Sequence, residues 1–600
     1  MDDALRLQRH RGAFLRNQLR AFGDIAYDTD AALLKRWNVF FPRFNGYSVG
    51  QQSLEYAHLL LFSDDRTYGT DDAGEANRIL RRILDHQDLN PSSETFGNFF
   101  WMTHWDRVKD RNAVSFLCAG LVYAYLSFPN KLHPQTKEAL EKAFPNMLAG
   151  IRKHKVRWQY TNIFFLNLGG LVCLSRVLDD PSIHAEAISD FNTWLEGTST
   201  DGFHEFNSPT YTPVTLFGLE AAWALTQDTT FKARLERTMH LITHQMALNM
   251  MPSGFLGGAP SRAYKPNAIT GLGQAAVYAH IKFGTPCPVL DDDSTTMYNN
   301  FTLFDYVPPS SVRKLATEKA EYTEIHDRGV SIASRRTHVI TPDFGLASQC
   351  ADRVGGHSPP SYILLVRKAN TMRKSVPFLP DESFLHQPCA TFVSRQKGTQ
   401  IVGKLHYELA EDQRQRFIND PTYICEPHVL FGLRNDIVEV RIGNVDWGGG
   451  SIHLHPGQPI AISYGNLFLG VITQPLDQSS RRLHLSSGDD GELRLCITIH
   501  GGPNLHKEDN PTDVLLFVDV QKPQGSLSDY ADHLTGFHLV QENNDQFATQ
   551  HINGTRITYP FTASDPDPLG QALHLSPNLT WYPGDLIKLV NREQPLPFEL

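Results

Sequence analysis

Apolar positions along the first half of the chain repeat with the spacing of helices. From Ala4 to Lys282, periodic apolar residues are separated by short polar or Gly/Pro breaks, which is the pattern of consecutive helices. The predicted helical segments are residues 31–37, 53–62, 73–84, 112–128, 136–154, 161–178, 183–195, 209–225, 231–249 and 271–283. Successive helical hairpins suit a toroid or a solenoid, and because no fixed-period repeat is visible we favour a closed α/α toroid.

The second half has the pattern of strands. Apolar residues alternate with less apolar ones over residues 493–499, and Asn553-Gly554 between two short strand-like runs is a strong hairpin signal. A Pro/Ser-rich break at residues 307–311 separates the two halves. We therefore predict a multidomain protein, α then β: an N-terminal α/α toroid over residues 1–306, then an antiparallel β-sandwich over residues 312–600 that contributes to the cleft.

Composition agrees with a large globular protein. Six hundred residues with 41% hydrophobic content exceed what one hydrophobic core usually holds. The net charge is −10, with 65 acidic and 55 basic residues, and no block of Lys/Arg predicts a nucleic-acid or membrane partner. The N-terminus lacks the apolar run of a signal peptide, and no segment has about 18 uninterrupted apolar residues. We expect a soluble chain, cytoplasmic as given, or secreted or periplasmic if a leader has been removed. The sequence sets no oligomeric state.

Cysteine and histidine spacing gives no metal prediction. Seven cysteines occur without a C-x-x-C pair, which argues against a disulfide framework and a zinc ribbon. His453 and His455 would share one face of a strand, but no third ligand is identifiable.

The richest stretch for chemistry is residues 201–223. Asp201-Gly202 is a turn dipeptide, and Ser208-Pro209 is a helix-start signal, so Tyr211 falls in the first turn of a helix. The unpaired N–H groups and positive dipole end of that turn favour a phenolate, which suits a proton-transfer group. The alternative is an ordinary half-buried aromatic residue.

This pattern, Asp-Gly, then an acidic residue, then Ser-Pro and Tyr on a new helix, resembles the segment with the catalytic tyrosine in polysaccharide lyases of the heparinase II/III-like group. The resemblance implies a helical toroid followed by a β-sandwich. It also implies β-elimination at a uronic acid in an anionic polysaccharide or oligosaccharide, with glucuronate the expected sugar and an unsaturated uronate as product. No cofactor is expected.

The resemblance extends to Asn162, which lies just inside a helix that Thr161 could cap. In the lyase group an asparagine at such a helix start holds the uronate carboxylate. Many members follow it with a histidine, but here the next residue is Ile163, which shifts the proton transfer towards Tyr211. The alternative is that Asn162 is a hydrogen-bonding residue at a helix end.

Two later segments supply further candidates through the same resemblance. Arg262 and Tyr264 follow a glycine-rich loop, and lyases of this type place an arginine beside the tyrosine; its planar fork suits a carboxylate. His357 follows two glycines and resembles a family histidine that reaches the cleft from the sandwich. The second histidine and the aspartate usual in that stretch are replaced by residues 359–361, Pro-Pro-Ser, so no metal site is expected there.

Substrate binding is predicted for a second group of residues. His104, Trp105 and Asn112 stand before or at a helix start, where tryptophan can stack on a sugar and polar groups can bind hydroxyls; a capped helix with a buried tryptophan is the alternative. Glu205 and Asn207, from the tyrosine segment, are the other candidates.

Two rival functions remain open. A glycoside hydrolase on the same toroid needs two carboxylic acids flanking the bond, and Asp201 and Glu205 are only four residues apart, with Asp106 or Asp110 as candidates for the other wall. A non-catalytic carbohydrate-binding protein would fit the missing histidine after Asn162.

Overall fold

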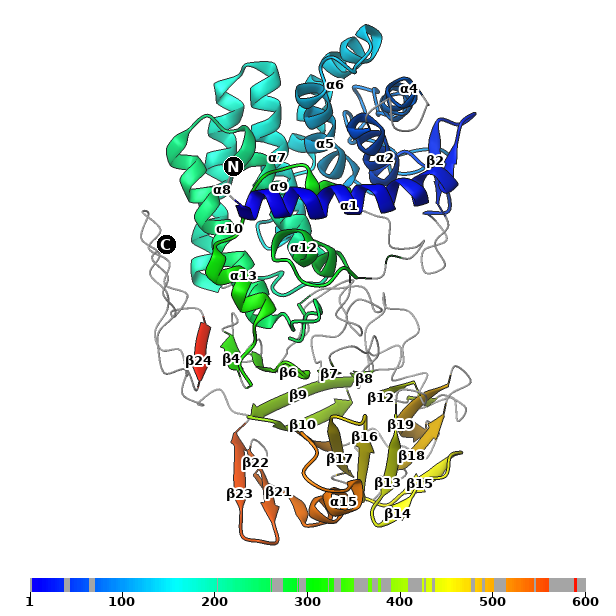
Figure 1. Ribbon diagram of the computed structural model, residues 1–600, viewed down its shortest axis with the longest axis vertical. Coiled ribbons are helices and arrows are strands. Elements are labelled where there is room, and N and C mark those ends of the chain that lie inside the picture. The colour runs from blue at the N-terminus through cyan, green and yellow to red at the C-terminus, as the bar shows by residue number, and fades with distance from the viewer. Residues whose placement is uncertain are drawn as a thin grey trace.

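The computed structural model describes residues 3–36, 44–63, 71–201, 203–258, 260–261, 273–288, 290, 298–321, 323–327, 336–349, 365–368, 376–378, 390–407, 424–425, 428–433, 437–475, 481–487, 491–500, 514–543, 546–560 and 587–590. Helices gather at one end of the molecule and strands at the other (Figure 1). Three predicted site residues, Arg262, Tyr264 and His357, lie outside the described residues.

Helical hairpins build the first half, as predicted. The helices are α1 (Asp3–Ala26), α2 (Gln51–Phe62), α4 (Asp72–Leu84), α5 (Ala113–Ser127), α6 (Pro134–Lys153), α7 (Thr161–Leu178), α8 (Pro181–Asp201), α9 (Tyr211–Leu225), α10 (Thr229–Asn249), α12 (Gln274–Lys282) and α13 (Ser310–Thr317), with the 3-10 turn η3 (Asn299–Thr302). One predicted helix is wrong: residues 31–37 contain β2 (Leu33–Arg36), which pairs with β1 (Tyr27–Asp28) and β3 (Gly46–Ser48). The run of apolar and basic residues in β2 was too short to distinguish the helical period from the strand period.

Helix α1 ties the two ends of the helical half together. It runs along α2 at one side and along α12 and η3 at the other (Figure 1). Arg11 donates from Nε and Nη2 to the Ile281 carbonyl at 3.0 and 2.7 Å. Because α1 joins the first helices to the last, the hairpins close into the predicted α/α toroid.

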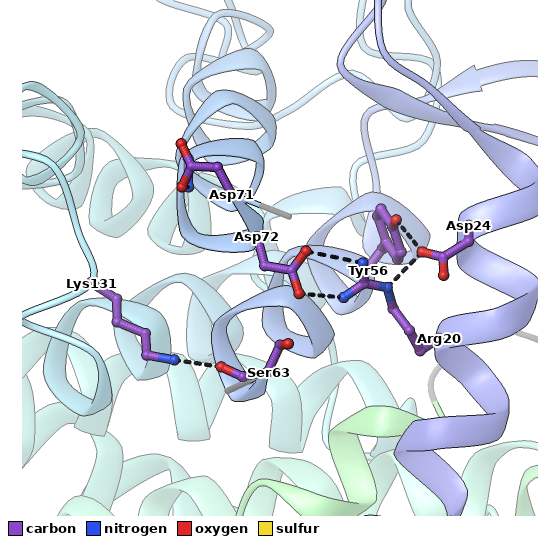
Figure 2. Close-up of polar contacts among 8 residues, drawn as sticks. Arg20, Asp24, Tyr56, Ser63, Asp71, Asp72 and Lys131 are labelled. Atoms are coloured by element: carbon purple, nitrogen blue, oxygen red, sulfur yellow. Dashed lines mark hydrogen bonds and ion pairs between the residues drawn. The ribbon is translucent and has the colours of Figure 1, made fainter. Parts of the chain in front are cut away.

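A buried ion pair fastens the C-terminal end of α1. Figure 2 shows the Arg20 guanidinium between Asp72, the first residue of α4, and Asp24. The two Arg20–Asp72 bonds are 2.8 and 3.1 Å long, and the Tyr56 hydroxyl on α2 donates to Asp24 at 2.7 Å. This paired, forked geometry is the arrangement in which a partly buried arginine is best satisfied.

Helix α7 is a core helix of the toroid. Within the described residues it alone is long and apolar enough to cross a membrane, yet 78% of its 18-residue window is buried inside the protein. Its apolar surface is therefore covered by neighbouring helices.

Antiparallel strands build the second half. They are β4 (Thr323–Asp327), β5 (Arg336–Ile340), β6 (Phe344–Gln349), β7 (Leu365–Lys368), β8 (Val376–Phe378), β9 (Ala390–Lys397), β10 (Gln400–Tyr407), β11 (Ile424–Cys425), β12 (His428–Leu433), β13 (Glu439–Ile442), β14 (Val445–Asp446), β15 (Ile452–Leu454), β16 (Pro459–Ser463), β17 (Phe468–Pro475), β18 (Arg481–Ser487), β19 (Glu492–His500), β20 (Val514–Gln521), β21 (Phe537–Asn543), β22 (Gln546–His551), β23 (Arg556–Pro560) and β24 (Ile587–Val590), with helix α15 (Leu527–Thr535) before β21. The predicted hairpin at Asn553-Gly554 joins β22 to β23, and Gly554 has the positive φ of 91° that favours glycine.

Two of these sheets form the predicted β-sandwich. A seven-stranded sheet, β14-β13-β16-β17-β20-β10-β9, packs against the sheet β15-β18-β19-β12-β8. Leu493, Leu495 and Ile497 of β19 point into the shared core, which confirms the alternation seen in the sequence. The other face of the seven-stranded sheet is covered by α15 and the β21-β22-β23 sheet.

A five-stranded sheet, β24-β4-β5-β6-β7, lies between the toroid and the sandwich (Figure 1). Ile340 on β5 belongs to the helical core, whereas its neighbour Val339 belongs to the sandwich core. Successive strand residues point to opposite faces, so His338 shares the toroid-facing side with Ile340. This layer, absent from the sequence prediction, is what brings the strand half against the helices.

The helical half continues past the Pro/Ser-rich break. Helix α13 packs on α10, and Lys319 beyond it donates to the carbonyls of Ala247 and Leu248 at 2.6 and 3.0 Å. The first strand of the second half begins at Thr323. The division between residues 306 and 312 stays a prediction.

Candidate active site

Helices α7 and α9 start at the same end of the toroid. They touch where Gly169 meets Gly218, because a Cβ on Gly169 would lie 2.5 Å from the Gly218 carbonyl oxygen. Each glycine is about two turns from the first residue of its helix. The ring of Trp158, just before α7, packs against the ring of His204, just after α8, with the ring centroids 4.9 Å apart. The end of α8 thus lies beside the start of α7, and the chain then turns into α9.

The start of α7 holds a carboxylate. The Asn162 backbone N–H donates to Glu205 Oε2 at 2.6 Å, and its side-chain Nδ2 donates to Oε1 and Oε2 at 2.8 and 2.7 Å. Both residues are buried. Thr161 does not cap the helix, since its hydroxyl donates backwards to the carbonyls of Trp158 and Gln159. One orphan backbone donor and the positive end of the helix are satisfied by the Glu205 carboxylate instead.

These contacts fix the orientation of the Asn162 amide. Turning the amide over would place Oδ1 against the Glu205 oxygens, so Nδ2 must face Glu205. The Oδ1 atom is then buried with no hydrogen-bond partner found among the described residues. A buried acceptor without a donor is uncommon in folded proteins and often belongs to a functional site.

Tyr211 lies in the first turn of α9, as predicted, and is its first residue because the helix starts two residues later than expected. Ser208 bonds the start of this helix: its Oγ accepts from the Tyr211 N–H at 2.9 Å, and its own N–H donates to Thr212 Oγ1 at 2.9 Å. Asn207 has φ 46°, in the left-handed region that few non-glycine residues adopt. Tyr211 is 9% exposed. Its place is therefore set by a short, tightly bent segment from Glu205 to Thr212.

The same segment is held from the other side by the chain that follows α10. The Ser261 N–H and Oγ donate to the Phe206 carbonyl at 3.1 and 2.7 Å. At Gly258, a Cβ would lie 2.7 Å from both Asn207 Nδ2 and His338 Nδ1, and closer still to Asn249 Oδ1. Only a glycine leaves room for these three polar side chains. We call Asn207, Asn249 and His338 the junction cluster.

His338 brings the strand half into this region. Its Nδ1 makes a short hydrogen bond with Asn249 Oδ1. Asn249 Nδ2 donates to the Gln245 carbonyl at 3.0 Å, so Oδ1 is the acceptor and His338 Nδ1 carries the proton. Backbone contact supports the same junction, since a Cβ on Gly345 of β6 would lie 2.6 Å from Gly257 Cα.

The predicted substrate-binding residues before α5 occupy different surroundings. Asn112 is part of an internal network: its Nδ2 donates to the Tyr160 hydroxyl at 3.2 Å, and its Oδ1 bonds His154 Nε2 at 2.8 Å. Burial lowers the pKa of His154. Trp105 is buried against Phe44, with ring centroids 5.5 Å apart, while His104 is exposed. Asn112 thus adjoins the residues leading into α7, whereas Trp105 packs as a core side chain.

Of the four carboxylates named for a hydrolase, the three whose side chains the structure describes are not arranged for that chemistry. Glu205 is bound to Asn162, and Asp106 pairs with Lys109 at 3.2 Å on the surface. The hydrogen bond from Lys109 lowers the pKa of Asp106, whereas a glycosidase general acid needs a raised pKa. Asp110 accepts from the Asn112 N–H at 2.9 Å.

Sequence patterns did not single out His338 or Asn249. Both lie in ordinary strand and helix patterns, and their meeting depends on how β5 docks against α10. The one available signal was Gly257-Gly258, because adjacent glycines often mark a close backbone approach. The described residues contain no group of three or more His, Cys, Asp or Glu side chains arranged to hold a metal ion.

Comparison with known proteins adds family and fold likenesses. A family model described as a domain of unknown function (DUF8769) matches residues 15–249, from within α1 to the last residue of α10. No curated protein matches the sequence.

Two similar solved structures are a heparan sulfate lyase mutant from Pedobacter heparinus and a chondroitin AC lyase from Streptomyces coelicolor A3 in complex with chondroitin sulphate. The first is 11% identical, covers 92% of this chain and 94% of its own, and has a TM-score of 0.42. The second is 12% identical, covers 92% and 84%, and has a TM-score of 0.46. Both are named as lyases.

Proposed function

We propose that this protein is a polysaccharide lyase that cleaves a uronic-acid-containing glycan, glucuronate-containing by preference, through β-elimination. One observation carries the proposal: the start of α7 binds a carboxylate through both the backbone N–H and the side-chain amide of Asn162. The same donors fit a uronate carboxylate. Tyr211, a group able to exchange a proton, begins the helix beside it.

Elimination needs a neutralised carboxylate first. The C5 proton of a uronate is weakly acidic, and hydrogen bonds to its carboxylate stabilise the negative charge that develops as the proton leaves. Asn162 provides such donors at the positive end of a helix. Arg262, outside the described residues, is proposed to assist. Glu205 holds the same donors in this structure, so the substrate carboxylate must take over contacts that Glu205 makes.

A base then removes the C5 proton, the electron pair forms the C4–C5 double bond, and the C4–O bond breaks. The departing oxygen takes a proton. We assign both transfers to Tyr211: the phenolate accepts the C5 proton and the phenol returns it to the leaving oxygen. His357 remains a candidate for the first step. Asn207, in the segment that leads to Tyr211, is proposed to contact the sugar. The other proposed substrate contacts are His104, Trp105, Asn112 and Tyr264.

An ultraviolet screen tests this function. The protein is incubated with glucuronan-type, alginate-type and glycosaminoglycan polymers, and the absorbance of the unsaturated uronate is followed. We expect one class of polymer to give an absorbing product and Tyr211→Phe to abolish it. New reducing ends without absorbance would instead establish a hydrolase, and binding without new ends would establish a carbohydrate-binding protein; either result refutes the lyase.

A further inference from the structure

The segment that carries Glu205 and Tyr211 has two anchors. One is Asn162 on α7, which binds Glu205. The other is the junction cluster, in which the side chains of Asn207, Asn249 and His338 converge on the same side of Gly258 and His338 bonds Asn249. Only five residues separate Glu205 from Tyr211, so a shift at Asn207, which lies between them, is transmitted to both.

Asn207 is a sensitive point in this segment. Its backbone is in the left-handed region, φ 46°, which an L-residue keeps only when its surroundings hold it. The bend at Asn207 directs the next residue, Ser208, into the two hydrogen bonds that start α9. If the contacts around the Asn207 side chain are loosened, the bend can relax and the start of α9 shifts with it.

His338 is the member of the cluster that comes from the strand half. It is fully buried on the toroid-facing side of β5, and its Nδ1–H bonds Asn249 at the end of α10. The two glycines at residues 257 and 258 allow this approach. The imidazole therefore joins the five-stranded sheet to the end of α10, and the Asn207 side chain approaches the same side of Gly258.

We propose that His338 is a positioning residue through which the strand half places Tyr211: by holding Asn249, it fixes Asn207 and the bend that leads into α9. The catalytic consequence rests on the proposed function, whereas the structural consequence does not depend on turnover. The required property is one N–H donor at the Nδ1 position. Asparagine supplies a similar donor near the Cβ atom, whereas leucine fills space without one.

Hydrogen exchange of the full-length protein tests the structural part. His338→Leu is expected to raise the exchange rate of amides in residues 206–212 at least tenfold, and His338→Asn to restore it towards the wild-type rate. His58→Leu is the matched control, because His58 is also fully buried and hydrogen-bonded, to the Gly120 carbonyl at 3.0 Å, but lies on α2. Unchanged exchange of residues 206–212 in folded His338→Leu would overturn the proposal.

Gly258→Ala gives a second perturbation, which removes no polar group. Its Cβ would enter the junction cluster 2.7 Å from two polar atoms, so the cluster must open and exchange of residues 206–212 must rise. Gly12→Ala is the control, since its Cβ would meet nothing nearer than 3.4 Å. This variant decides the question if His338→Leu fails to fold. If the amides of residues 206–212 exchange at the same rate in Gly258→Ala and Gly12→Ala, the proposal is wrong.

Kinetics on a cleaved polymer test the catalytic part. Displacing a reacting group by about 1 Å can cost about 10²-fold in rate, so kcat of His338→Leu should fall by about that factor with little change in KM. His338→Asn should recover to within about threefold of wild type and keep the wild-type pH profile, because a positioning residue exchanges no proton. An Asn variant as inactive as the Leu variant would show that the imidazole itself transfers the proton and would refute positioning. Absence of turnover in the wild-type protein refutes the lyase instead, and the exchange experiment still decides on His338.

Discussion

Removing the Asn162 side chain separates two roles that the structure allows. Of the three hydrogen bonds that Glu205 receives from Asn162, two come from Nδ2 and one from the backbone. Asn162→Ala therefore leaves the Glu205 carboxylate with the backbone donor alone from this residue. A hydrogen bond to a charged group contributes about 1.5–3 kcal/mol, and the two Nδ2 bonds share one amide group, so we expect unfolding to be easier by about 2–4 kcal/mol.

The catalytic effect has a separate magnitude. Losing one preorganised donor to developing negative charge lowers turnover by about 10²–10³-fold. Asn162 produces this loss directly if it binds the substrate carboxylate. It could also produce a loss indirectly if its only task is to hold Glu205 in place.

A double-mutant cycle with Glu205→Ala distinguishes these cases. Each variant is assayed by initial rates of ultraviolet absorbance on the cleaved polymer, and its stability is measured by urea unfolding. If Asn162 binds substrate, adding Asn162→Ala to Glu205→Ala should lower turnover by a further factor of about 10². If the second change costs less than threefold, Asn162 acts only through Glu205. Wild-type turnover in folded Asn162→Ala would refute any role for it in the reaction.

Three further predictions follow from other parts of the structure. Tyr211→Phe keeps the ring that packs at the start of α9 but removes its exchangeable proton, so kcat should collapse while polymer binding, measured by calorimetry, survives; near-normal turnover would remove Tyr211 from the chemistry. Lys282→Met should destabilise the protein by about 3–5 kcal/mol at pH 7 in urea unfolding, because it leaves the buried Glu220 carboxylate without its 2.7 Å partner. Burial already raises the pKa of Glu220 despite Lys282, so the folded variant binds an extra proton and its loss of stability should shrink as the pH falls towards 5. A loss of stability that does not change with pH would contradict this. Limited proteolysis should cut within residues 318–321, which follow α13 and include exposed positions, giving a helical N-terminal fragment by circular dichroism; a β-rich N-terminal fragment would contradict the division of the chain.

The sequence predicted the architecture well because periodicity is a local property. Ten helical segments were predicted, and in the described structure only the segment at residues 31–37 contains a strand instead. That stretch is short and borders β1, where a helical and an extended pattern cannot be told apart. The five-stranded layer was missed because its strands are short and its β24 comes from residues 587–590, far along the chain from β4.

The site was predictable where a helix start defines it. Ser208-Pro209 located the start of α9 to within two residues, and the Tyr211 N–H donates to Ser208 Oγ at that start. Glu205 and Asn162 were each candidates, but no sequence rule says that a carboxylate 43 residues downstream binds the start of α7. His338 depends on the register of β5 and on docking between the halves, and a one-residue slip would turn it to the sandwich side.

The Glu205 contact also limits how a uronate can bind. Exchange of one carboxylate for another at Asn162 conserves the number of hydrogen bonds, so the main cost is moving Glu205. The backbone that follows Glu205 cannot move easily, because Phe206 accepts two hydrogen bonds from Ser261 and the Asn207 side chain lies close to Gly258. A uronate that takes the Asn162 donors therefore has to displace the Glu205 side chain by rotation while the backbone stays in place. A lyase built in this way has a carboxylate site that is already formed before substrate arrives, with the internal carboxylate keeping the buried donors of α7 satisfied until a uronate replaces it.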